Sequence, residues 1–185
     1  PLDFRWIGVR GPREDFASIT KEGLRINPFP VNIKEVKPTS TLFYRQQHNV
    51  FTATVTMNYT PQSENDLAGV VCLQNEKFNY VFGVTKKGTD YVLVLERTEK
   101  GQSKIIASQK INVRQPIHLQ IDAQDDVYRF NYSTDGQSFR NIGGTVSGDI
   151  LSTNVAGGFT GCVIGMYATG GNDIRLYQVY GTSVL

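Results

Sequence analysis

The sequence has few of the residues that build metal sites, disulfide frameworks or membrane spans. Cys72 and Cys162 are its only cysteines, and His48 and His118 are its only histidines. Two thiols cannot form a tetrahedral zinc site without those histidines. Both cysteines lie within apolar strand patterns, so we expect two buried free thiols. No apolar run approaches the roughly 20 residues of a membrane span, and we expect no membrane partner.

Neither sign of charge dominates, with 19 Lys and Arg against 17 Asp and Glu. There is no basic stripe, which disfavours nucleic-acid binding. The N-terminal residues 1–4 have neither the basic head nor the apolar segment of a signal peptide. The chain begins on a strand-like stretch, which suggests a piece of a longer polypeptide. A periplasmic, an extracellular and a cytoplasmic bacterial location are all compatible with the sequence.

Motifs of common enzyme classes are also missing. There is no Gly-x-Ser-x-Gly elbow, no His-Glu-x-x-His, no phosphate loop and no dinucleotide fingerprint. A glycosidase needs two carboxylates on one sugar, ~5 Å or ~6.5–9.5 Å apart. Most acidic residues here lie in turn-like segments or on polar strand faces. Examples are Glu64, Asp66, Glu99, Asp125 and Asp135. We therefore expect solvated acids, no catalytic residue and no enzymatic activity from this chain alone.

The main positive signal is alternation with a period of two. Apolar residues alternate with threonines and an asparagine from residue 51 to 60, and similar patterns return at 78–84, 119–123 and 128–132. Turn signals separate these runs at Gly88, Gly101 and Asp135-Gly136. The only helical candidate, residues 12–21, is short enough to be a single turn. The pattern predicts an all-β, two-sheet antiparallel β-sandwich that occupies residues 1–185 as a single domain.

The alternation also predicts which residues form the core and which segment leaves it. We expect eight apolar side chains between the two sheets: Phe51, Val55, Phe82, Leu95, Leu119, Ile121, Phe130 and Ile164. Residues 27–41 are the least periodic part of the chain and contain Pro28, Pro30 and Pro38. We interpret this segment as a long surface excursion between early strands.

Three strand-like segments carry polar residues or glycines that packing alone does not require. They are Phe43–His48, Leu67–Glu76 and Gly158–Tyr167. Their order and spacing resemble the C-terminal β-sandwich of family 43 glycoside hydrolases, the β-xylosidase and α-arabinofuranosidase group. The resemblance extends from Trp6 to about Tyr180, and it implies a concanavalin A-like jelly roll of two curved sheets.

The resemblance also implies an accessory role. In that family the hydrolytic carboxylates lie on a five-bladed propeller domain, here on the same or a partner chain. The sandwich would pack on this propeller and shape its pocket for a plant cell-wall oligosaccharide. Phe159 matches a family aromatic that reaches across to close the pocket, and Gly157 and Gly158 free the backbone before it. The alternative for Phe159 is burial in the core.

Two further candidates for the sugar pocket or the interdomain surface have two interpretations each. Arg45, Gln46, Gln47 and His48 are either donors that face a sugar or partner domain, or a structural cluster. We favour the structural role for Arg45, since a buried arginine must be paired. Trp6 is either a core aromatic or part of the interdomain seam.

A structural calcium ion is common in jelly rolls of the type that this chain resembles. Asp3 and Asp173 would be the candidate ligands if the first and last strands meet. Arg175 and Gln178 dilute the charge of the last strand, which argues against the site. We expect no other cofactor.

Two rival functions stay open. One is a free-standing carbohydrate-binding module, which would need exposed aromatic side chains on a concave face. The candidates are Tyr80, Tyr91, Tyr128 and Tyr167. The other is a purely structural sandwich without sugar contact. An exposed apolar patch would favour the accessory role, whereas an aromatic-lined polar groove would favour the module.

Overall fold

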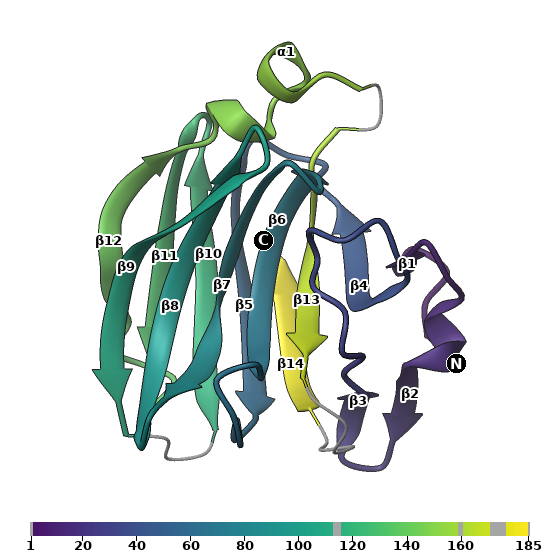
Figure 1. Cartoon of the computed structure of the whole chain (residues 1–185), viewed down its shortest axis with the longest axis vertical. Coiled ribbons are helices and arrows are strands. Elements are labelled where there is room, and N and C mark those ends of the chain that lie inside the picture. Colours follow the sequence, from purple (N-terminus) through teal and green to yellow (C-terminus); the bar gives the residue numbers. More distant parts are fainter. Residues whose placement is uncertain (1, 113–115, 159–160, 171–176, 185) are drawn as a thin grey trace.

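The computed structural model consists almost entirely of strands (Figure 1). It describes residues 2–112, 116–158, 161–170 and 177–184, the last range for its backbone only. The strands are β1 (Ile7–Val9), β2 (Ala17–Thr20), β3 (Gly23–Ile26), β4 (Thr39–Arg45), β5 (Val50–Asn58), β6 (Leu67–Asn75), β7 (Phe78–Lys87), β8 (Asp90–Glu99), β9 (Gln102–Ile111), β10 (Ile117–Gln124), β11 (Val127–Ser133), β12 (Arg140–Ser147), β13 (Val163–Thr169) and β14 (Tyr177–Val184). The helices are short: η1 (Arg13–Asp15), η2 (Asp149–Leu151) and α1 (Thr153–Ala156).

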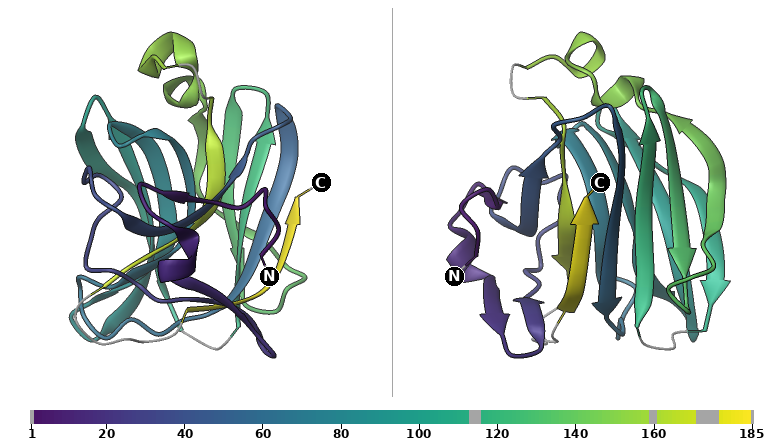
Figure 2. Two further views of the ribbon diagram at one scale, coloured as in Figure 1. Left: turned by 90° about the vertical axis from the view of Figure 1, so that its right-hand side faces the viewer. Right: turned by 180° about the vertical axis from the view of Figure 1, so that it is seen from behind.

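The strands form two seven-stranded sheets that pack face to face (Figure 2). Sheet 1 has the order β1-β4-β13-β6-β7-β8-β9, and sheet 2 has the order β12-β11-β10-β5-β14-β3-β2. Neighbouring strands are antiparallel in both sheets. The predicted all-β sandwich is therefore confirmed. β1 lies at one edge of sheet 1 and β2 at one edge of sheet 2, and both are at the right of Figure 1.

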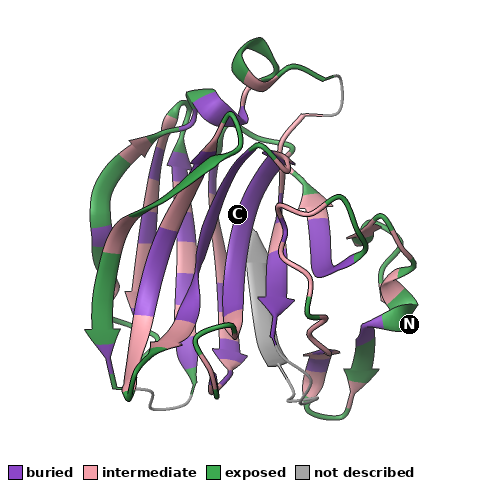
Figure 3. Ribbon diagram, viewed as in Figure 1, coloured by how far each residue is buried: buried purple, intermediate pink, exposed green. Residues whose placement is uncertain are grey.

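The core lies between the sheets and contains all eight residues that the alternation predicts. Figure 3 shows buried positions along the middle of the central strands. Phe130 on β11 has no exposed surface, and its ring centroid lies 5.6 Å from that of Tyr80 and 5.5 Å from that of Phe82 on β7. Burying each such side chain contributes about 1.5–3 kcal/mol. These aromatic contacts join the two sheets.

The hairpin turns at residues 88–89 and 100–101 are confirmed. Lys87 pairs with Asp90, and Glu99 pairs with Gln102, so each turn has two residues. Lys100 and Gly101 have φ angles of 52° and 77°, the left-handed values of a tight hairpin. The only helical candidate, residues 12–21, is a single 3₁₀ turn followed by β2, as its length indicates.

The Asp135-Gly136 pair also connects two adjacent strands, but in a wider loop than the dipeptide indicates. β11 ends at Ser133 and β12 begins at Arg140. The Asp135 carboxylate accepts hydrogen bonds from the backbone N–H groups of Gln137 (2.8 Å) and Ser138 (2.7 Å). These bonds lower the pKa of Asp135 and stabilise the longer connection.

The interpretation of residues 27–41 as a surface excursion is only partly correct, because this segment has a core of its own. Ile33 is 2% exposed and packs on the outer face of sheet 1 with Phe43, Val71 and Tyr167. Its backbone N–H donates a hydrogen bond to the Tyr167 hydroxyl (3.0 Å). The segment therefore covers apolar side chains that would otherwise face solvent.

Within the described ranges, no helix is long and apolar enough to span a bilayer.

Candidate functional site

One end of the sandwich, the end that carries α1, contains a polar cleft of about 520 Å³. Three connections line it: the β4–β5 connection, the β10–β11 turn and the segment from Gly148 through α1 to β13. The lining residues are Gln46, Gln47, Asn49, Asp125, Asp126, Tyr128, Gly148, Asp149, Leu151, Ser152, Thr153, Gly161 and Cys162. Amide and carboxylate groups predominate, which suits the recognition of hydroxyl groups or of basic side chains.

Gln46, one of the predicted site residues, is the central polar group of this cleft. Its side-chain oxygen accepts a hydrogen bond from the Tyr128 hydroxyl (3.0 Å), and its side-chain nitrogen donates to the His48 carbonyl (3.0 Å). Its backbone N–H donates to the Cys162 carbonyl (3.2 Å). Gln46 thereby joins both sheets to the C-terminal end of the α1–β13 loop.

The N-terminal end of the same loop is held by the last residues of β6. The Gln74 side-chain amide donates to the Gly157 carbonyl (3.1 Å), and the Asn75 amide donates to the Ala156 carbonyl (3.5 Å). Gly157 and Gly158 have φ angles of 74° and 84°, which glycine adopts without strain. Gln74 and Asn75 thus support this loop from the end of β6.

Phe159 follows these glycines and lies outside the described residues. The structure therefore does not test whether its ring reaches a partner or enters the core. Of the described residues near it, Gly161 lines the cleft together with Gln46, and Gly157 is bound by Gln74.

A second, smaller pocket of about 160 Å³ lies beside the cleft. It is lined by Tyr44, Arg45, Gln46, Gln47, His48, Phe51 and Ile164. The His48 side chain on its rim is exposed. The segment that the sequence singled out therefore lines two adjacent hollows.

The expected buried, paired state of Arg45 is wrong. Arg45 is the last residue of β4 and is exposed. Within the described part of the chain, no carboxylate forms an ion pair with it. Leu42 packs in the main core and Phe43 on the outer face of sheet 1, whereas Arg45 is at the end of the strand, where its guanidinium lies in solvent. Arg45 is thus available to a partner.

Trp6 lies at the border between the core and the surface. It is half-buried and packs against the main core, beside a small apolar pocket between the sheets that Val55, Val70 and Ile164 also line. Its ring meets the Tyr44 ring edge-on at a centroid distance of 5.7 Å. Trp6 therefore closes one side of the core while part of it stays at the surface.

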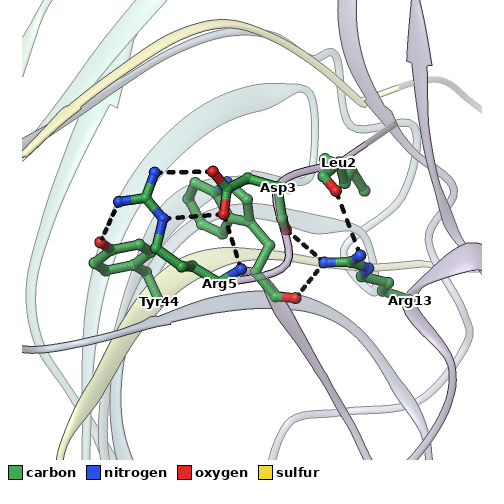
Figure 4. A network of polar contacts seen from close by, with 6 residues as sticks. Leu2, Asp3, Arg5, Arg13 and Tyr44 are labelled. Carbon is green, nitrogen blue, oxygen red and sulfur yellow. Dashed lines mark hydrogen bonds and ion pairs between the residues drawn. The ribbon is translucent and has the colours of Figure 1, made fainter.

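Asp3, a predicted calcium ligand, has a different partner. Its carboxylate accepts from Nε and Nη2 of Arg5, both at 2.9 Å (Figure 4). These bonds lower the pKa of Asp3 to about 2. Asp173 lies outside the described residues, and the described part holds no cluster of three His, Cys, Asp or Glu side chains suited to a metal. The guanidinium supplies the charge that a cation would bring to Asp3.

The shifted carboxyl groups do not resemble the general acid of a glycosidase. Hydrogen bonds lower the pKa values of Asp3, Glu14, Glu35 and Asp135. A general acid at a sugar bond needs the opposite shift, because it must hold its proton near neutral pH.

The two cysteines are free thiols, as expected. Cys72 is fully buried on β6, and Cys162 is partly buried at the edge of the cleft. Burial raises the pKa of Cys72 well above its usual value and that of Cys162 to about 12. Both thiols are therefore protonated and poorly nucleophilic at neutral pH.

Comparison with known proteins shows the family of this chain. Residues 1–177 match the family model of the β-xylosidase C-terminal concanavalin A-like domain. The chain belongs to this family.

Relatives of this β-xylosidase C-terminal domain are longer proteins. The chain is 30% identical over 171 residues to a non-reducing end α-L-arabinofuranosidase of Bacteroides ovatus, which covers 91% of the chain and 32% of that protein. A GH43_12 protein from a capybara gut metagenome is 41% identical, with a TM-score of 0.85 over 91% of this chain and 33% of that one. A GH43B protein of a Bacteroides ovatus xyloglucan PUL is 26% identical, with a TM-score of 0.92 over 100% and 37%.

This C-terminal domain therefore spans about a third of the length of these relatives. It matches their C-terminal concanavalin A-like part and not the remaining two thirds. The family match and its extent describe the accessory sandwich domain of xylosidases and arabinofuranosidases.

Several features of the domain's site have no clear signal in the sequence. Asp125, Asp126 and Asp149 line the cleft, yet in the sequence they are ordinary turn residues. Arg5 and Arg13 bind residues 2–6 (Arg5 to Asp3, Arg13 to three carbonyl groups), yet in the sequence they resemble any surface arginines. The prediction of exposed tyrosines for sugar binding is wrong for three of the four candidates, because Tyr80, Tyr128 and Tyr167 are buried. Aromatic alternation fits a core face as well as a binding face, so pattern alone does not separate them.

Proposed function

We propose that this chain is the accessory sandwich of a xylosidase- or arabinofuranosidase-like glycoside hydrolase, and that it packs on a catalytic propeller domain and shapes its sugar pocket. The observation that carries the proposal is the family match together with its extent. The chain matches a C-terminal domain, and it accounts for only about a third of its relatives. Hydrolysis then belongs to the remaining part.

The geometry of the α1 end supports this role. The cleft, the smaller pocket and the braced α1–β13 loop lie together there, and they expose amides, carboxylates and Arg45. These groups can bind the hydroxyl groups of a pentose oligosaccharide or polar groups on the propeller. We propose that this end of the sandwich faces the sugar pocket.

Phe159 is the residue that we assign to the pocket itself. A loop held at both ends by Gln74 and Gln46 can present a side chain with little loss of conformational entropy. An apolar ring at that place would exclude water from the reaction and contact one face of a sugar ring. We propose neither a metal nor another cofactor for this domain.

The free-standing carbohydrate-binding module is less well supported. Of its four candidate tyrosines, only Tyr91 is not buried. On the outer face of sheet 2, Gln120 donates to Thr54 and accepts from Asn131, and Asn141 donates to Asn131. These amides satisfy one another, which leaves fewer groups for a ligand.

The test is Phe159→Ala in the longer polypeptide that joins this chain to a catalytic domain. We expect kcat/KM on an aryl-xyloside or aryl-arabinofuranoside to fall by about tenfold or more. Ile105→Ala, an exposed position on the edge strand β9, is the matched control and should have no effect. The stability of chain 1–185 should change little. A loss of about 3–5 kcal/mol in that chain would instead place the ring in the core.

A further inference from the structure

The N-terminal arm, residues 2–6, holds a phenylalanine out in solvent. Phe4 is 85% exposed, more than any other large apolar side chain in the described ranges. It lies in a turn in which the Trp6 N–H donates to the Asp3 carbonyl (3.1 Å). A single exposed apolar residue is ordinary on a protein surface. The inference therefore rests on the contacts that hold this turn in place.

The first set of contacts joins Asp3, Arg5 and Tyr44 (Figure 4). The Asp3 carboxylate accepts from the Arg5 backbone N–H and from two guanidinium nitrogens, each at 2.9 Å. The Arg5 guanidinium also donates to the Tyr44 hydroxyl (3.2 Å) and lies 5.6 Å from the centroid of that ring. These contacts fix the turn on either side of Phe4 and attach it to β4.

The second set comes from Arg13 at the start of η1. Its Nη1 donates to the carbonyl oxygens of Asp3 and Trp6, both at 2.6 Å, and its Nη2 donates to that of Leu2 (3.4 Å). One guanidinium therefore binds three carbonyl groups of the arm. Phe4 is presented on a backbone that is already ordered, so a partner that buries the ring loses little entropy in fixing it.

We propose that Phe4 is the apolar anchor of the interface with the catalytic domain that precedes this sandwich in a longer polypeptide. The inference rests on the proposed function. Because the family is a C-terminal domain and the chain covers about a third of its relatives, a catalytic domain of the longer polypeptide would join at the N-terminal arm. Phe4 is separated from residue 1 by at most about 11 Å of extended chain.

The anchor is continuous with the candidate site. Arg5 contacts Tyr44, and Tyr44 lines the smaller pocket with Arg45 and His48. A domain seated on Phe4 would therefore extend over Arg45 and His48 toward the polar cleft. This surface combines an apolar centre with polar groups around it, the composition of a stable protein interface.

The experiment places a cleavable protease site directly before residue 1 in the longer polypeptide. After cleavage, the affinity of the two halves is measured by titration, and their co-elution is followed by size-exclusion chromatography. Phe4→Ser should weaken the affinity by about tenfold or more, as expected for a buried aromatic anchor. Ile19→Ser on β2 is the control, since Ile19 is also exposed (55%), and it should leave the affinity unchanged.

The outcomes distinguish a failure of the proposed accessory function from a failure of the Phe4 anchor. Parental halves that separate completely after cleavage would contradict the proposed accessory function. Parental halves that stay together, with Phe4→Ser as tight as the parent, would overturn the anchor alone. A Phe4→Ser chain 1–185 that melts below the parent would show that the ring stabilises the arm itself, and that result also overturns the anchor.

Discussion

The side-chain amide of Gln74 donates a hydrogen bond to the carbonyl oxygen of Gly157 over 3.1 Å. The donor is the penultimate residue of β6, a central strand of sheet 1, and the acceptor begins the loop that leads to β13. Gln74 is only 9% exposed, and its buried side-chain oxygen has no hydrogen-bond partner among the described residues. A buried, half-satisfied amide is costly, which is consistent with a residue retained for holding this loop.

We predict that Gln74→Met loosens the loop without unfolding the domain. The change removes one hydrogen bond of about 1 kcal/mol, and it also removes a buried oxygen that has no partner in the described ranges, so global stability should stay within about 1 kcal/mol of the parent. Amide hydrogen exchange in residues 153–158 should become about fivefold faster. Gln109→Met on the exposed edge strand is the control. Exchange at the parental rate would show that Gln74 does not hold the loop.

We predict that Phe130→Ala is among the most destabilising single changes in the core. The ring is fully buried and contacts Tyr80 and Phe82 across the sandwich. Truncation should lower the free energy of unfolding by about 3–5 kcal/mol. Urea denaturation of chain 1–185 measures this, and Ile105→Ala should stay within about 0.5 kcal/mol of the parent. A Phe130→Ala protein as stable as the parent would refute the core assignment.

We predict that Tyr167→Phe destabilises the segment that covers the outer face of sheet 1. The Tyr167 hydroxyl accepts the Ile33 N–H in a buried position (3.0 Å), and its loss leaves that donor unsatisfied at a cost of about 1–3 kcal/mol. Limited proteolysis within residues 27–38 should become faster. Tyr91→Phe is a matched control on β8, where the side chain is partly exposed. Equal proteolysis of parent and variant would contradict this function of the hydroxyl.

We predict that Arg5→Met raises the pKa of Asp3 from about 2 toward its ordinary value of 3.8. Because the folded-state pKa lies below the unfolded one, the contribution of Asp3 to stability is complete above about pH 4 and is lost as the pH falls toward 2. Carbon-13 NMR titration of the Asp3 carboxyl group measures the shift, with Arg10→Met as the control. An unchanged midpoint in Arg5→Met would show that Arg5 is not its partner.

Much of the fold follows from local pattern. Alternation along residues 51–60 and 119–132 places Phe51, Leu119 and Phe130 in the core, and glycines at 88 and 101 mark two tight turns. These features depend on backbone geometry and on the alternation of buried and exposed side chains. A few neighbouring residues determine both.

Features that depend on distant residues are not predictable in this way. The burial of Ile33 requires Tyr167, which lies 134 positions away. Arg13 binds three carbonyl groups of the N-terminal arm, and these groups come within its reach only when the arm packs beside η1. The burial of Tyr80 and Tyr128 depends on which strand face meets the second sheet. The burial of Tyr167 depends on the segment that covers the outer face of sheet 1. Alternation identifies the two faces of a strand but does not say what covers each of them.

The central claim is that the sandwich completes a pocket whose catalytic residues lie elsewhere. The most direct measurement compares kcat/KM on an aryl-xyloside and an aryl-arabinofuranoside for the longer polypeptide, for its catalytic part alone, and for that part with purified chain 1–185 added back. We predict no turnover by chain 1–185, a reduced kcat/KM for the catalytic part alone, and recovery when the chain is added. Turnover that follows chain 1–185 through several chromatography columns, or a catalytic part as efficient as the longer polypeptide, would contradict the account.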